Sequence, residues 1–336
     1  MPFNKITNLT VIRSWLSKAN FTFGSNPKIQ QRKEWRKFIP EPYKAILIIS
    51  ADFELAWAWQ YANTQNPYHL ALEKAKQARH NIPNILNLCE KYNIPITWAT
   101  VGHLFLESCQ KKKNVPHPEI RRLDHFENNY WKFDKGDWFQ NDPCSNVQEN
   151  PEWYAPDLIQ QILDSKVHHE IGCHTFSHID CRDEVCSSEV FNNEIEACKS
   201  EAEKLGLQLK TFVHPAHTIG NLDNLVKQGF TSFRTDYRNF LGYPIKHQNG
   251  LWEFEQTAEF VYRKNWSVDY HIYRYITIIK RAIKSNTVCL LWFHPSFDPI
   301  VVEKIWPVVF RFIDKNREKI WVTTHTEYVE WLEGNE

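Results

Sequence analysis

Residues 168–178 read HHEIGCHTFSH, and this stretch decides how the rest of the sequence is interpreted. Its first part, His168 to Cys173, has the apolar content of a short buried strand, and His174 and His178 follow with three residues between them. If the chain turns into a helix or a tight loop after the strand, this spacing places both imidazoles on one side, where they can share one metal ion. Taken alone, the pair is equally compatible with a helix cap or a solvated face.

Three other segments place an acidic residue or a histidine where a predicted strand ends. They are ISADFE (49–54), FVHPAHTIG (212–220) and LLWFHPSFD (290–298). Active sites of barrels and open α/β sheets lie at the carboxyl ends of strands. Four such strand ends in one chain therefore indicate an active site built from all of them.

The periodicity of apolar residues alternates between strand and helix from Lys44 onwards. Strands are predicted at 45–51, 94–101, 168–173, 210–215, 230–234, 251–255, 287–293 and 319–323. Helices are predicted at 69–91, 156–165, 187–205, 221–228, 270–284, 300–316 and 325–333. Apolar strands separated by helices imply parallel pairing, and this number of strands closes more naturally into a barrel than into an open sheet. The predicted fold is α/β, a distorted TIM-like barrel of about seven to eight parallel strands.

The sequence divides into an N-terminal extension, residues 1–40, and a barrel domain, residues 41–336. In the extension, apolar residues recur at helical spacing among basic ones, which predicts an amphipathic helix. The residues concerned are Leu9, Ile12, Leu16 and Ala19, with Lys5, Arg13 and Lys18. Such a helix either touches a membrane surface or packs on the barrel, and the short, weakly charged segment favours packing.

The barrel domain contains one interval without clear periodicity, residues 111–155. Long loops of this kind are usually functional or disordered, and the many aromatic residues here argue against disorder. We therefore predict a lid insertion rich in aromatic side chains.

Composition excludes several classes of protein. There are 40 lysines and arginines and 40 aspartates and glutamates, so the net charge is zero and no nucleic-acid partner is expected. The first thirty residues lack the apolar segment and cleavage site of a secretory signal, and no run of about 18 apolar residues occurs. We expect a cytoplasmic protein without a transmembrane segment. Its eight cysteines include no CxxC pair and are expected to be mostly buried thiols.

Asp52 and Glu54 end the apolar strand that begins at residue 45. Side chains two apart on a strand share a face, so both carboxylates should point into the mouth of the barrel. A helix cap and a solvated acid are the alternatives, and the apolar run beside them argues against both. Two carboxylates this close repel each other unless a positive charge lies near, and a divalent cation held by His174 and His178 supplies that charge.

His294 ends the last long apolar strand before a proline, which makes its position rigid. A histidine in this place can be a core residue. At the barrel mouth it is also a candidate general acid, because its pKa lies near neutrality and proton donation to a leaving group is worth about 10² to 10⁴ in rate.

Together these motifs resemble those of the NodB-homology polysaccharide deacetylases, also called carbohydrate esterase family 4. The matching segments are ADFE (51–54), ITWATVG (96–102), HTFSH (174–178), VHPAHTIG (213–220) and LLWFH (290–294). The resemblance covers about residues 44–334 and implies the NodB-homology fold. It also implies that Glu54, His174 and His178 bind the metal, that Asp52 is the catalytic base and that His294 is the general acid.

The sequence departs from the family pattern in two places. The family has adjacent aspartates, whereas Phe53 separates Asp52 from Glu54, so which acid binds the metal and which is the base stays open. The family's arginine, which holds the catalytic aspartate, corresponds here to His214, with His217 close behind. His214 either acts in catalysis as a protonated replacement, adds a metal ligand or packs in the core. The acidic partner of His294 is one of four carboxylates: Glu253, Glu255, Glu259 and Asp298.

The predicted function is metal-dependent hydrolysis that removes an N-acetyl or related acyl group from a carbohydrate or glycan precursor. Zinc suits two histidines and one carboxylate with an open position, and Co²⁺, Ni²⁺ or Fe²⁺ fit nearly as well. Five side chains are candidates for contacting the substrate, although tryptophan is also a common core residue. They are Trp57, Trp59, Trp131, Trp138 and His217. Two alternatives are a deformylase or amidase of small metabolites on the same scaffold, and a degenerate, non-catalytic carbohydrate-binding protein.

Overall fold

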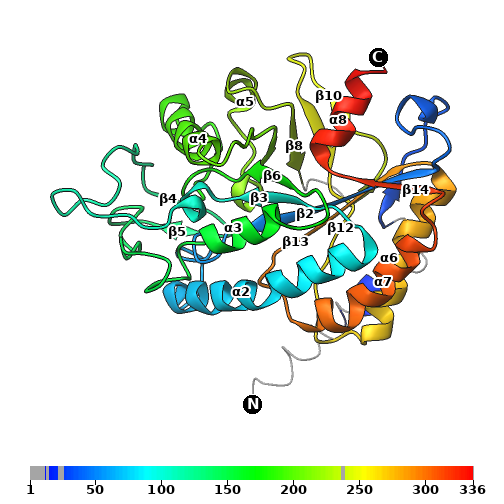
Figure 1. Cartoon of the computed structure of the whole chain (residues 1–336), viewed down its shortest axis with the longest axis horizontal. Coiled ribbons are helices and arrows are strands. Elements are labelled where there is room, and N and C mark those ends of the chain that lie inside the picture. The colour runs from blue at the N-terminus through cyan, green and yellow to red at the C-terminus, as the bar shows by residue number, and fades with distance from the viewer. Residues whose placement is uncertain (1–11, 13–14, 22–25, 236–238, 336) are drawn as a thin grey trace.

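The computed structural model describes residues 12, 15–21, 26–235 and 239–335. Its main sheet contains ten strands, most of them parallel (Figure 1). These strands are β2 (Ala45–Phe53), β3 (Thr97–Thr100), β6 (Glu170–Cys173), β7 (Thr211–Val213), β8 (Ser232–Thr235), β10 (Ile245–Lys246), β11 (Trp252–Glu255), β12 (Ala258–Glu259), β13 (Val288–Phe293) and β14 (Ile320–Thr323). Each predicted strand has its counterpart here, with ends shifted by a few residues.

The helices also lie where the sequence predicts them. They are α2 (Pro67–Tyr92), α3 (Pro156–Leu163), α4 (Ser188–Glu203), α5 (Leu222–Lys227), α6 (Val268–Ser285), α7 (Trp306–Asp314) and α8 (His325–Glu333). A π-helical turn, η4 (Val301–Ile305), precedes α7 and completes the predicted helix over 300–316. Short 3-10 turns are η1 (Trp35–Lys37), η2 (Gly102–Phe105) and η3 (Pro215–His217).

Local sequence sets the ends of the long helices. Asn66 caps α2 by accepting a hydrogen bond from the His69 amide, and Ser267 caps α6 in the same way. Both helices end at an asparagine in the left-handed conformation, Asn93 and Asn286. Asparagine tolerates this conformation better than most residues, so the chain can turn sharply into β3 and β13.

The centre of the sheet is β2, all nine residues of which are buried. It pairs with β13 along one edge, and its other edge is shared by β14 at Ala45–Ile48 and β3 at Ser50–Phe53. From β3 the order continues through β6, β7 and β8 to β11. The carboxyl ends of β2, β3, β6, β7, β8 and β13 therefore meet at one end of the sheet.

One segment, residues 252–259, brings the two sides of the sheet together. Its first half, β11, pairs with β8, and its second half, β12, pairs with β13. Between them the Gln256 amide donates to the Thr235 carbonyl and the Thr257 amide donates to the Leu290 carbonyl. The sheet thus curls into a distorted, incompletely closed barrel of seven parallel positions with β14 as an eighth strand, which confirms the predicted fold class.

The insertion, residues 111–155, lies at the left end of the molecule in Figure 1 and has only a short hairpin of regular structure. The hairpin consists of β4 (Phe126–Glu127) and β5 (Lys132–Phe133). Most of its large aromatic side chains are buried, whereas Tyr130 is exposed. The buried ones are Trp131, Phe133, Trp138, Phe139, Trp153 and Tyr154. The segment is therefore a packed part of the structure, and its interpretation as a lid stays a prediction.

The described part of the N-terminal extension contacts the barrel, although Ile12 and Leu16 of its predicted apolar face are more than half exposed. Residues 15–21 are helical, Phe21 is buried, and Arg281 of α6 donates to the Phe21 carbonyl. Further along, β1 (Lys28–Ile29) pairs with β9 (Phe240–Leu241). Leu9, Lys5 and Arg13 lie outside the described residues, and membrane contact stays a prediction. In the described part of the chain, no helix is both long and apolar enough to cross a bilayer.

We predict that Trp306 is a principal anchor between α7 and the sheet. Its ring is fully buried and lies 4.8 to 5.4 Å, centroid to centroid, from Phe260, Phe293, Phe297 and Phe310. Trp306→Ala should lower the free energy of unfolding by about 3 to 5 kcal/mol in urea titrations, because it leaves a cavity among these rings. Val308→Ala on the exposed side of α7 is the control and should change it by less than about 0.5 kcal/mol. Equal effects of the two variants would contradict the packing described.

Candidate active site

The candidate site is built on the carboxyl end of β2, where Asp52 and Glu54 lie two residues apart. Both side chains are buried, each about 4% exposed. The chain leaves the strand at Leu55, whose φ of 44° turns it into the following loop. The two carboxylates thus share one face of the strand, as the alternation of side chains predicts, and both border the same cavity.

Three histidines surround the Glu54 carboxylate. His178 Nε2 lies 3.0 Å and His174 Nε2 lies 3.4 Å from Glu54 Oε2, while His294 Nε2 lies 3.4 Å from Oε1. His174 Nδ1 is 2.7 Å from the Val213 carbonyl and donates to it, so its Nε2 carries the lone pair that faces Glu54. The histidines come from the loop after β6 and from the end of β13, which are far apart in sequence.

The loop after β6 places the two spaced histidines side by side. Thr175 and His178 both adopt the left-handed conformation, with φ of 59° and 61°, and the two imidazole centroids of His174 and His178 are 4.8 Å apart. Glu194 of α4 holds the loop by accepting from the Ser177 amide at 2.8 Å and from its hydroxyl at 2.7 Å. A tight loop, and not a helix, therefore brings His174 and His178 together.

This donor set suits a divalent cation. Glu54 Oε1, His174 Nε2 and His178 Nε2 are buried and have no hydrogen-bond partner, and one donor atom from each residue lies within 4.8 Å of the others. Burial opposes ionisation of Glu54, but the nearby charge of His294 and the adjacent imidazoles of His174 and His178 outweigh it and hold the pKa of Glu54 well below its usual range. Two imidazoles and one carboxylate with an open position match catalytic zinc sites.

Asp52 is held by an arginine that the sequence analysis did not find. Arg234 of β8 is fully buried and donates from Nη2 to Asp52 Oδ2 at 2.6 Å and from Nη1 to Ser50 Oγ at 2.9 Å. Burial raises the pKa of Asp52, but the Arg234 guanidinium, with help from His174, overcomes this and holds that pKa below its ordinary value. Arg234 lies at the end of the predicted strand 230–234, and this position is the one feature of the sequence that could have indicated a place in the site.

His214 does not occupy the position that was expected of it. Its Nε2 donates to the Gly220 carbonyl at 3.0 Å, and its ring packs between Phe212 and Phe233. Burial lowers the pKa of His214 to about 3, so it is neutral and cannot replace an arginine as a cation beside Asp52. The suggestion that His214 substitutes for the family's arginine is therefore wrong in its geometry, because Arg234 fills that place.

His294 stands at the edge of the site with Glu259 as its acidic neighbour. Glu259 Oε1 lies 3.8 Å from His294 Nδ1, so of the four carboxylates considered it is the one placed beside this ring. Burial disfavours the charged imidazole, but the negative charges of Glu54, Glu259 and Asp52 outweigh it and raise the pKa of His294 to about 9. The imidazole is therefore protonated at neutral pH and can donate a proton.

These groups open onto one cavity of about 350 Å³. Its lining residues are Asp52, Glu54, Ala58, Trp59, Ala62, Tyr130, Trp131, His178, Ala216, His217, Glu259, Trp292 and His294. Of the side chains expected to contact substrate, Trp59, Trp131 and His217 are present. Burial and the charge of Arg234 lower the pKa of His217 to about 4, so this residue faces the cavity as a neutral group.

Two tryptophans expected at the substrate site lie in the core instead. Trp57 is 1% exposed, donates to the Trp153 carbonyl at 3.2 Å and packs on His103. Trp138 is 2% exposed and donates to the Ser177 carbonyl at 3.0 Å. Neither borders the cavity, so their prediction as substrate contacts is wrong. Aromatic side chains in this region serve mainly to pack the insertion.

The chain is similar to known proteins in part of its sequence and in its fold. The sequence model of the polysaccharide deacetylase family matches residues 64–229. A Mycobacterium smegmatis structure and a Pseudomonas aeruginosa PAO1 structure, both assigned as polysaccharide deacetylases, each share 12% identity with this chain, with TM-scores of 0.60 and 0.58. Each alignment covers 88% of this chain and 92% of the other. The structure of Puue allantoinase aligns with a TM-score of 0.57 at 14% identity over 93% of this chain and 95% of its own.

At these identities the solved structures show a shared fold. No curated protein matches the chain. The matched segment, residues 64–229, contains His174 and His178, whereas Asp52, Arg234 and His294 lie outside it and are placed beside them by the structure.

We predict that Asp52 and Arg234 are coupled in stability. Arg234→Met should lower the free energy of unfolding by about 3 to 5 kcal/mol at pH 7, since it leaves a buried carboxylate unpaired. Asp52→Asn combined with Arg234→Met should recover part of that loss. Both are measured by chemical denaturation with a chelator present, and Arg263→Met at an exposed position is the control.

The pair of Asp52 and Arg234 also makes the free energy of unfolding depend on pH. Because the folded pKa of Asp52 is depressed, its stabilising effect is complete above about pH 4, the ordinary aspartate value, and is lost as pH falls through the lower folded pKa. A coupling energy of zero at pH 7 in the double-mutant cycle would contradict the pairing.

Proposed function

We propose that this chain, which matches the polysaccharide deacetylase family model over residues 64–229 and shares the fold of such proteins, removes an acetyl or related acyl group from the nitrogen of a sugar or glycan precursor by hydrolysis. The observation that carries this proposal is the convergence of His174, His178 and His294 on the buried Glu54 carboxylate. A structural ion pair does not require three imidazoles around one carboxylate, whereas metal-assisted acyl transfer uses such a set.

Glu54, His174 and His178 would hold one divalent cation. When bound, the cation supplies a Lewis acid that polarises the acyl carbonyl and lowers the pKa of water from 15.7 to about 7. Zinc is favoured by the two imidazoles and one carboxylate, and Co²⁺, Ni²⁺ or Fe²⁺ suit the same donors. The hydrogen bond from His174 Nδ1 to the Val213 carbonyl fixes this ligand in the required tautomer.

Asp52 is assigned as the general base. Arg234 engages its Oδ2, whereas Oδ1 is buried beside the cavity without a hydrogen-bond partner. Oδ1 can therefore accept the proton of the water that attacks the acyl carbon. Arg234 keeps Asp52 ionised and fixes its orientation, which is the function that the family resemblance implies for an arginine at this place.

His294 is assigned as the general acid. Its imidazolium donates a proton to the nitrogen of the breaking C–N bond, so that the sugar leaves as an amine and the acyl group as a carboxylic acid. Glu259 stabilises the protonated form from the other side of the ring. Asp52, Glu54 and His294 line the same cavity, so the proton acceptor and the proton donor can both reach a substrate bound there.

The cavity supports a substrate of limited size. Its volume of about 350 Å³ lies near the lower end of ligand pockets, which range from about 300 to 1,000 Å³, and suits one sugar ring with its acyl group. Trp59 and Trp131 line it and offer apolar faces on which a sugar ring can stack. The same size favours a second candidate, hydrolysis of an amide in a small metabolite, which the shared fold with an allantoinase also supports.

A panel of substrates separates these two functions. N-acetylated monosaccharides and short oligosaccharides test deacetylation, and N-formyl compounds and cyclic amides test the second candidate. The non-catalytic alternative is favoured by the two departures from the family pattern, the missing arginine and the separation of Asp52 from Glu54. Arg234 pairs with Asp52 and so removes the first of these two reasons.

We predict distinct effects for the base and a metal ligand. His178→Ala should lose the catalytic ion, measured by metal analysis of the purified protein, together with all hydrolysis. Asp52→Asn should retain the ion and lower kcat/KM by about 10² to 10⁴, since only the proton acceptor is removed. His69→Ala at an exposed position of α2 is the control. Full activity in either site variant would refute the mechanism.

We also predict a pH effect of Glu259. Activity that requires protonated His294 falls as pH rises through its pKa, which the neighbouring carboxylates raise to about 9. Glu259→Gln removes one of these carboxylates, so the alkaline limb of the kcat/KM profile should move to lower pH without a change in metal content. Glu253→Gln, which alters a carboxylate paired with His247, should leave the limb in place. An unchanged limb in Glu259→Gln would exclude this role.

A further inference from the structure

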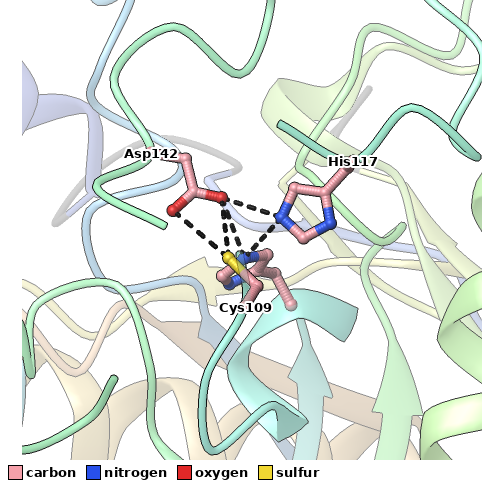
Figure 2. Close-up of side chains that lie close together, drawn as sticks. Cys109, His117 and Asp142 are labelled. Carbon is pink, nitrogen blue, oxygen red and sulfur yellow. Dashed lines mark hydrogen bonds and ion pairs between the residues drawn. The ribbon is translucent and has the colours of Figure 1, made fainter. Parts of the chain in front are cut away.

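A second cluster of metal-ligand side chains lies outside the proposed active site. His103 belongs to η2 after β3, Cys109 follows it, and His117 and Asp142 come from the insertion. Figure 2 shows the carboxylate of Asp142, the imidazole of His117 and the sulfur of Cys109 pointing toward one another. The side chains of His103 and Asp142 are fully buried, His117 is nearly so and Cys109 is half-buried. None of the four lines the active-site cavity or has a part in the mechanism above.

The donor atoms of this cluster converge. His103 Nε2 and His117 Nε2 are 3.1 Å apart, and they lie 3.1 Å and 2.8 Å from Asp142 Oδ2. Cys109 Sγ lies 3.6 Å from the same oxygen. Bond lengths of about 2.0 to 2.1 Å for Zn–N and about 2.3 Å for Zn–S place neighbouring donors of a tetrahedral site about 3.3 to 3.6 Å apart. The observed spacings of 2.8 to 3.6 Å are equal to these values or up to about 0.5 Å shorter, so small shifts of the side chains would admit the ion.

The surrounding hydrogen bonds orient these donors. His103 Nδ1 is 3.2 Å from the Trp153 carbonyl and donates to it, so His103 Nε2 carries a lone pair directed at the cluster. Asp142 Oδ1 accepts from the Cys144 amide at 2.9 Å and from the Tyr154 hydroxyl at 3.3 Å, which leaves Oδ2 facing the histidines. Metal ligands in proteins are characteristically fixed by such outer hydrogen bonds.

We propose that His103, Cys109, His117 and Asp142 bind one zinc ion in a tetrahedral, structural site. A thiolate and a carboxylate balance the charge of Zn²⁺, and the two neutral imidazoles add none, so the buried cluster becomes electrically neutral on binding. All four positions are filled by protein atoms, which is typical of structural rather than catalytic zinc. The proposal is independent of the function assigned to the active site.

The site would fix the insertion to the barrel. His103 and Cys109 lie between β3 and the insertion. His117 and Asp142 lie within the insertion, 14 and 39 residues beyond His103. The insertion contributes Tyr130 and Trp131 to the wall of the active-site cavity. A zinc ion in this place therefore holds part of that wall without contact with the substrate.

The test uses the full chain with cobalt as the probe. The protein is stripped with a chelator and titrated with Co²⁺, and metal content after zinc reconstitution is measured in parallel. We expect two equivalents of metal per chain and a sulfur-to-cobalt charge-transfer band in the near ultraviolet, which the active-site ligands cannot produce because they include no cysteine. His174→Ala should lose one equivalent and keep the band.

Variants of the cluster complete the test. Cys109→Ser should abolish the band, and His117→Ala should lower the metal content to one equivalent and lower the midpoint of thermal unfolding. His125→Ala, at an exposed histidine of the same insertion, is the matched control and should retain two equivalents and the band. A stripped wild-type protein that takes up at most one equivalent, without a charge-transfer band, would overturn the proposal and identify the cluster as a metal-free hydrogen-bond network. Because this readout uses the unaltered chain, a variant that fails to fold does not affect it.

Discussion

The architecture of the site depends on the electrostatic compensation of two buried carboxylates on one strand. Asp52 lies at the end of β2 and Glu54 directly follows this strand, around which β3, β13 and β14 are arranged. Neither carboxylate can remain ionised there without positive charge nearby. The two receive different partners. Arg234 reaches Asp52 from β8, whereas the histidines reach Glu54 from the loop after β6 and from the end of β13. This difference supports Asp52 as the proton acceptor and Glu54 as the metal ligand, a choice that the spacing of the two residues left open.

Much of the fold and part of the site follow from local sequence. The buried strands are short apolar runs followed by helices, so their positions and parallel arrangement are predictable, and the spaced histidines and the end of the last long strand are visible as motifs. Arg234 is different, because an arginine inside a strand shows no pattern and its pairing with Asp52 exists only after the sheet has curled. The prediction that Trp57 and Trp138 contact the substrate is wrong for another reason. Their sequence neighbours suggest a binding surface, but burial is decided by how the insertion packs against the loop after β2.

The insertion contributes to both groups of side chains proposed to bind metal, as a wall of the first and as ligands of the second. Its buried aromatic side chains are part of the main hydrophobic core. Among them, the Trp131 ring lies 5.2 Å from the ring of His178 and donates to the Ala58 carbonyl. On the other side, His117 and Asp142 meet His103 at the end of β3. The irregular spacing of these ligands gives no recognisable motif, which is why the cluster could not be predicted from the sequence. One segment thus shapes the substrate cavity and carries half of a separate set of metal donors.

The proposed mechanism requires that Glu54, His174 and His178 hold a divalent cation at the cavity that Asp52 and His294 also line. Anomalous diffraction at the zinc edge from crystals grown with zinc tests it most directly. We expect a peak about 2.0 to 2.2 Å from a Glu54 oxygen and from the Nε2 atoms of His174 and His178, with Asp52 still paired to Arg234. A map with no peak at this place, and with Glu54 still in contact with the imidazoles, would contradict the claim and show that the histidines serve only to neutralise a buried carboxylate.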